Sequence, residues 1–293
     1  METLQRRNFE MNDIPRGRPN FGALSARFPA FSLAHEQIVA LAHYCFRNDY
    51  PLRTPSERLC SSLGEDCCED FQEIIHLADG DFTRGTLKLI RTLYERSITI
   101  STIAYEAIPE KRERLTTRFV DYQWLNWEKV YKGAMRVLGD EGPATWDALD
   151  HCPNRQKIER EVNRVSIQVK ARTHRCSSCG FTQTLKSTLG KWGPTPDEMA
   201  KALGGSWEST YMPAYIMPNM IIHPSVFDLR YPLADANVPA AMYMLLSAVK
   251  AQNFLLELNL YDVIGSTERK INDFGHQVAR YLNGQREKRG QAG

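Results

Sequence analysis

The sequence lacks any run of about 18 uncharged apolar residues, the length that spans a membrane as a helix. Its first twenty residues are polar and arginine-rich, without the apolar core of a secretion signal. Glycine-rich phosphate loops, HExxH and GxSxG are missing too, which argues against P-loop nucleotide hydrolysis, zinc proteolysis of that type and α/β-hydrolase chemistry. The net charge of +2 does not by itself imply a strongly polyanionic partner for the chain as a whole.

Cysteine is present, but its pattern does not indicate disulfides. The seven cysteines are odd in number and unevenly spaced, and no export signal accompanies them. This pattern is typical of reduced thiols in a reducing compartment. We therefore expect a cytoplasmic protein that does not enter a membrane.

The stretch 82–108 is expected to be a long central helix. Its apolar residues recur at helical steps on two faces, and a helix that is apolar on two sides usually lies inside a bundle. Arg91 and Glu95 stand four residues apart on the border of one apolar stripe. Because burying an unpaired charge is costly, we expect both to be mostly buried and paired, either with each other or with the helix that carries His223.

Start and stop signals divide the rest of the chain into further helices. Thr54 to Glu57 forms a capping box with proline at the first helical position, and a break is expected near Gly64. Pro213 and Pro218 predict a kinked or broken helix, whereas Gly265 predicts a helix end. The predicted helices outside the central one cover 32–47, 54–80, 109–138, 155–172, 196–204, 207–223, 238–263 and 266–283.

No convincing pair of alternating strands is present, so the predicted fold class is all-α, a single multi-helix bundle around the central helix. Residues 1–30 are expected to be a flexible basic arm or a frayed terminus. An all-helical domain should cover 31–284, with a basic insertion at about 150–192. Residues 285–293 should form a disordered tail, and we expect the protein to be a homodimer.

One group of polar residues has the composition of a catalytic or ligand site. Tyr215, Asn219 and His223 follow one another at four-residue steps, which places them along one side of a helix. With Arg91 and Glu95 they offer a cation, a carboxylate, a phenol, an amide and an imidazole, a set suited to acid–base catalysis or anion binding. The alternative is a buried polar network that holds the bundle in register.

These residues also carry a resemblance. The segments Leu89–Ile98, Pro109–Tyr122, Gly190–Gly204 and Tyr211–Ser225 resemble, in order, a large bacterial family known only as a domain of unknown function. The resemblance covers roughly residues 65–260 and implies an all-helical fold without an established activity.

Within that resemblance, four residues fall on the family's motif positions: Arg91, Glu95, Tyr215 and His223. Asn219 stands where the family often has serine. The layout is also similar to HEPN helical ribonucleases, which carry an arginine a few residues ahead of a histidine. No arginine lies in that position before His223.

A second candidate site is the turn Cys176-Ser177-Ser178-Cys179-Gly180, which has the form of half a zinc knuckle. Structural zinc would need two more ligands, and the nearest candidates are His174, His151 and Cys152. Unligated thiols or a redox pair are the alternatives.

The turn lies within a basic segment. Residues 155–191 hold nine Lys or Arg and two Glu, a local balance of +7. Such a segment either contacts phosphates or forms solvated helix faces. The sequence thus leaves two functions open. One is a metal-independent ribonuclease or phosphodiesterase of a bacterial defence or toxin type, with His223 as acid/base and Arg91 on the phosphate. The other is a non-catalytic binding or scaffold protein.

Overall fold

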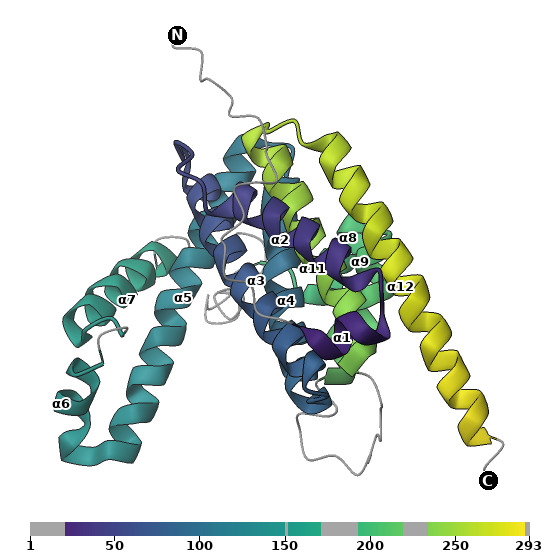
Figure 1. Cartoon of the computed structure of the whole chain (residues 1–293). Helices are drawn as coiled ribbons and strands as arrows, with labels where there is room; N and C mark the ends of the chain where they lie inside the picture. The colour runs from purple at the N-terminus through teal and green to yellow at the C-terminus, as the bar shows by residue number, and fades with distance from the viewer. Residues whose placement is uncertain (1–20, 150–151, 171–192, 219–233, 291–293) are drawn as a thin grey trace, which may run out of the picture. The chain divides into compact units, whose positions relative to one another are not determined.

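The computed structural model describes residues 21–149, 152–170, 193–218 and 234–290. Within these ranges every regular element is helical and no strand occurs, which confirms the all-α fold class (Figure 1). None of the described helices is both long and apolar enough to cross a membrane. The chain divides into two compact units, one made of residues 1–107 and 196–293, the other of residues 108–195. The second unit extends beyond the basic insertion expected at about 150–192.

The first unit is built from helices on both sides of the second unit in the sequence. Its described elements are α1 (Gly22–Arg27), α2 (Phe31–Phe46), α3 (Pro55–Asp79), α4 (Thr83–Ala104), α8 (Pro196–Leu203), α9 (Ser206–Tyr211), the π-helical turn η3 (Met212–Ile216), α11 (Ala234–Leu256) and α12 (Tyr261–Gly290).

Helix α4 is central to this unit, as the sequence predicts. It packs against α3 and α11, and its neighbours also include α8 and η3 (Figure 1). Ile90 and Ile98 of one apolar face are fully or almost fully buried, and so are Leu93, Ile100 and Ile103 of the second face. The helix ends at Ala104, earlier than predicted, and leaves the next residue, a tyrosine, exposed.

Helix α3 begins at the predicted capping box. The hydroxyl of Thr54 accepts from the backbone N–H of Glu57 at 3.2 Å, and the Glu57 carboxylate accepts from the backbone N–H of Thr54 at 3.2 Å. The predicted break near Gly64 is wrong, because α3 runs through it without interruption. A Cβ at Gly64 would lie 2.0 Å from Cδ1 of Phe46. This glycine therefore makes room for an aromatic ring of α2 and does not end a helix.

The boundary between the last two helices also differs from the prediction. Helix α11 ends at Leu256, and α12 runs through Gly265 to Gly290, past the end predicted near residue 283. The chain turns where Glu257 and Asn259 adopt positive φ angles of 53° and 58°. The side-chain oxygen of Asn253 accepts from the backbone N–H of Leu260 at 2.9 Å, so an asparagine side chain closes this turn.

The second unit contains α5 (Pro109–Leu138), the 3-10 turn η2 (Gly139–Glu141), α6 (Gly142–Asp147) and α7 (Arg155–Lys170). Among its described residues, the buried apolar side chains are Trp146, Ile158 and Val165. The ring of Trp146 meets those of Trp127 and Tyr131 edge to face, at 6.2 and 5.2 Å between centroids. The indole N–H of Trp146 donates to the Pro153 carbonyl at 3.0 Å. Large aromatic side chains of α5 thus pack within their own unit.

Candidate functional site

Arg91 and Glu95 form an ion pair on one side of α4. The Nε and Nη2 atoms of Arg91 lie 3.3 and 3.1 Å from Oε1 of Glu95. The pairing confirms the sequence prediction, but the predicted burial is wrong: 30% of the Arg91 side chain and 42% of the Glu95 side chain are exposed. The pair borders the buried stripe and does not interrupt it, so both charges keep contact with solvent.

Tyr215 of η3 joins this pair. The guanidinium carbon of Arg91 lies 5.0 Å from the centroid of the Tyr215 ring, within the range of a cation–π interaction. Residues far apart in the sequence therefore meet because η3 packs on α4. The two other predicted site residues, Asn219 and His223, lie outside the described residues.

An aromatic cluster extends the site beyond the predicted residues. Tyr94 is fully buried one turn from Arg91, and its hydroxyl donates to the backbone carbonyl of Trp207 at 3.1 Å. Its ring also lies 5.5 Å from the Trp207 ring. Tyr211 and Tyr215 stack on each other, with centroids 5.3 Å apart and planes inclined by 18°. A sequence signal existed for Trp207 and Tyr211, because they continue the four-residue steps of Tyr215 toward the N-terminus.

The phenols of Tyr94 and Tyr211 remain protonated at neutral pH. Burial raises the pKa of Tyr94 above its ordinary value of 10.0, and the neighbouring Tyr211 adds to the effect. Burial also raises the pKa of Tyr211, with a further contribution from the carboxylate of Asp197. Both hydroxyls can therefore donate hydrogen bonds, whereas neither is suited to act as a general base.

The predicted zinc ligands are mostly outside the described part of the chain. Cys176, Cys179, His174 and His151 all lie there. Cys152 is described, and it is a half-buried free thiol. Among the described residues, no group of three or more His, Cys, Asp or Glu side chains could hold a metal ion. The zinc site therefore stays a prediction.

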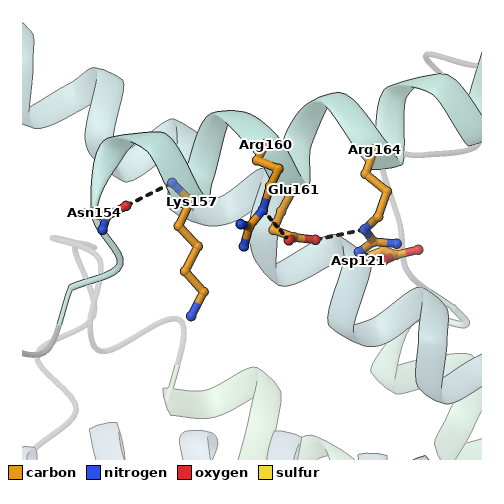
Figure 2. A network of polar contacts seen from close by, with 6 residues as sticks. All are labelled: Asp121, Asn154, Lys157, Arg160, Glu161 and Arg164. Carbon is orange, nitrogen blue, oxygen red and sulfur yellow. Dashed lines mark hydrogen bonds and ion pairs between the residues drawn. The ribbon is translucent and has the colours of Figure 1, made fainter.

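The described part of the basic segment is α7, and several of its cations have acidic partners (Figure 2). Arg164 donates to the buried Asp121 of α5 at 2.7 Å and to Glu161 at 2.8 Å. Arg160 lies 3.2 Å from Glu161, and Arg155 lies 2.7 Å from Glu159. Much of the positive charge of α7 is thus compensated by carboxylates of its own unit. The remainder of the segment, residues 171–191, lies outside the described residues.

Contacts at the start of α7 and between α7 and α5 hold this helix in place. The amide oxygen of Asn154 accepts from the backbone N–H of Lys157 at 2.9 Å and caps the start of the helix (Figure 2). The ammonium of Lys157 lies 5.5 Å from the centroid of the Trp124 ring. These contacts, with the Arg164–Asp121 pair, favour a structural role for this face of α7.

Comparison with known proteins gives one match. The model of a family of unknown function, DUF5677, matches residues 57–237, which is more than half of the chain. The matched range contains α4, η3 and therefore every described residue of the cluster around Arg91. No curated protein and no solved structure matches the chain.

Proposed function

Because the chain belongs to the family of unknown function DUF5677, whose description assigns no activity, we propose a function from the chain's own residues. The protein cleaves RNA without needing a metal ion, at the site where Arg91, Glu95 and Tyr215 meet. The observation that carries this proposal is the state of Arg91. Its guanidinium is oriented by a carboxylate and an aromatic ring, yet about a third of the side chain remains exposed.

An arginine in this state suits a phosphate. The guanidinium keeps its charge at all physiological pH values, and its planar set of donors matches the oxygens of a phosphate. Glu95 and Tyr215 restrict its orientation before a ligand arrives, which lowers the entropy lost on binding. In the transition state, Arg91 then stabilises the charge that develops on the phosphate oxygens.

His223 supplies the proton transfer in this proposal. An imidazole with an unperturbed pKa of about 6.5 can accept a proton near neutral pH. It takes the proton of the ribose 2′-hydroxyl, whose oxygen attacks the adjacent phosphorus. The bond to the 5′ oxygen breaks, water protonates that oxygen, and a cyclic phosphate remains. The helical layout is similar to that of HEPN ribonucleases, which favours RNA as the substrate, although the arginine that precedes the histidine in that group is missing before His223.

The experiment measures cleavage of single-stranded RNA by the purified protein in the presence of a chelator. We expect wild-type protein to cut, His223→Ala to be inactive with an unchanged circular dichroism spectrum, and Arg91→Lys to lose roughly a hundredfold in rate. Arg84→Lys is the matched control, because Arg84 is an exposed arginine of the same helix. It should leave the rate unchanged. Wild-type protein that cuts no RNA would contradict the proposal.

A scaffold role is the second candidate, and one observation favours it. The buried Tyr94 hydroxyl ties α4 to the Trp207 carbonyl of α9, as a residue that holds helices in register does. In that case wild-type protein should cut no RNA, and His223→Ala should destabilise the fold. The same set of variants therefore distinguishes the two candidates.

A further inference from the structure

In the chemistry proposed above Tyr215 only orients Arg91, and Tyr211 has no part. Tyr211 ends α9 and Tyr215 lies in η3, so the two rings come from consecutive elements. Both side chains are half-exposed, and Met212 between them is 58% exposed. A pair of nearly parallel rings thus borders solvent beside the guanidinium of Arg91.

The pair is supported from the interior of the unit. The buried ring of Tyr94 lies 6.3 Å from that of Tyr211 and 6.0 Å from that of Tyr215. The Tyr94 hydroxyl is fixed by the Trp207 carbonyl, so this support is itself held in place. Because the two rings stack on each other, a flat ligand can stack only on an outer face of the pair. The rigid base means that the pair loses little conformational entropy when it does so.

We propose that Tyr211 and Tyr215 form a platform on which an unpaired nucleobase stacks, next to the phosphate held by Arg91. This inference rests on the proposed function and narrows its substrate to single-stranded RNA. In a nucleotide one sugar separates the base from the phosphate. A base stacked on the tyrosine pair therefore has its phosphate close to the guanidinium of Arg91, which adjoins the pair. Bases of single strands are free to stack on aromatic side chains, whereas bases inside a duplex already stack on each other.

The test separates binding from cleavage by using RNA that cannot react. A fluorescent oligouridylate with 2′-O-methyl groups blocks the attacking hydroxyl, and an abasic oligomer of equal length and charge is its partner ligand. Fluorescence anisotropy with a chelator should show that wild-type protein binds the base-bearing strand at least about fivefold more tightly than the abasic strand. A duplex of the same sequence should bind like the abasic strand.

Substitutions at Tyr211 test whether the tyrosine pair causes the preference for the base-bearing strand. Tyr211→Leu keeps an apolar side chain without a π face and should abolish the preference, whereas Tyr211→Phe should retain it. Met212→Ala, at the exposed neighbour, is the control and should bind like wild type. The wild-type comparison of base-bearing with abasic strands decides the question even if Tyr211→Leu does not fold.

Each result has a distinct meaning. Equal wild-type binding of the two strands overturns the stacking platform, even if the protein cuts RNA. A preference that survives in a folded Tyr211→Leu variant overturns it as well. A base preference that depends on Tyr211, in a protein that cuts no RNA, supports the platform and overturns the proposed cleavage alone.

Discussion

At the scale of single residues, the exposure of the Arg91–Glu95 pair determines what its loss costs. Pairs four residues apart on a helix surface contribute about 0.3–0.5 kcal/mol, far below the ~3–5 kcal/mol lost when one partner of a buried pair is removed. We therefore expect Glu95→Ala to lower the free energy of unfolding by less than about 1 kcal/mol in urea titrations. A loss of several kcal/mol would show that the carboxylate is enclosed.

His43 of α2 should make stability depend on pH. Burial lowers the pKa of this imidazole from 6.5, and the nearby Arg47 lowers it further. Below about pH 6.5 the unfolded chain therefore binds a proton that the folded chain resists. As the pH is lowered below about 6.5, the free energy of unfolding should decrease until the pH is below the lowered pKa of His43. Above about pH 6.5 this residue contributes nothing to the pH dependence of stability.

Thermal unfolding of wild type and His43→Gln at pH 7 and pH 5 measures this effect. The variant cannot gain the proton, so acidification should reduce its melting temperature less than that of wild type. Equal reductions in the two proteins would contradict the assignment to His43.

At the scale of helices, two glycines that both lie inside a helix should differ in how substitution by alanine changes stability. Alanine inside a helix is intrinsically more stable than glycine by about 0.5–1 kcal/mol. At Gly64 the new methyl group would overlap the Phe46 ring, and overpacking of a core typically costs about 1–3 kcal/mol. Gly64→Ala should therefore destabilise the protein.

Gly133 of α5 is the matched control, because among the described residues no atom beyond its chain neighbours and the nearby backbone of its own helix lies within 4 Å of the position its Cβ would take. Gly133→Ala should leave the melting temperature unchanged or raise it. If both substitutions stabilised the protein, the close contact between Gly64 and Phe46 would be wrong.

These glycines also show how far the sequence could predict the helices. The start of α3 was predictable, because the Thr54–Glu57 capping box is complete within four residues. The continuity of α3 through Gly64 was not, since it depends on a ring in another helix. The end of α11 was missed because an Asn253 side chain closes the turn, whereas Gly265 is an ordinary residue inside α12.

The candidate site was also only partly predictable from the sequence. The Arg91–Glu95 pair follows from spacing on one helix, and the sequence predicted it. Helical spacing puts Tyr94 on an apolar face of α4, but its hydroxyl donates to a carbonyl 113 residues away, which no local pattern encodes. The stacking of Tyr211 on Tyr215 depends on the π-helical turn η3, which follows α9 and contains Tyr215. Residue spacing alone cannot predict how the two rings are oriented.

At the scale of the whole molecule, we propose a homodimer with one structural zinc per chain, held by Cys176 and Cys179 with two of His174, His151 and Cys152. Native mass spectrometry of protein purified without chelator should show two chains and two zinc ions. Cys176→Ser should lose the metal, whereas Cys60→Ser changes a buried thiol elsewhere and should retain it. Metal-free wild type with unchanged stability after chelation would contradict the zinc site.

The placement of α4 against α11 has a consequence for how the protein is made. About 130 residues separate the end of α4 at Ala104 from the start of α11 at Ala234. A ribosome that adds roughly 5–20 residues per second needs on the order of 10 s to cover that distance. During this interval α2, α3 and α4 leave the ribosome before α11 exists. The apolar surface that packs against α11 in the folded protein is then exposed to solvent. The nascent chain is then most exposed to aggregation and most in need of a chaperone, and the core is completed only after α11 has been synthesised.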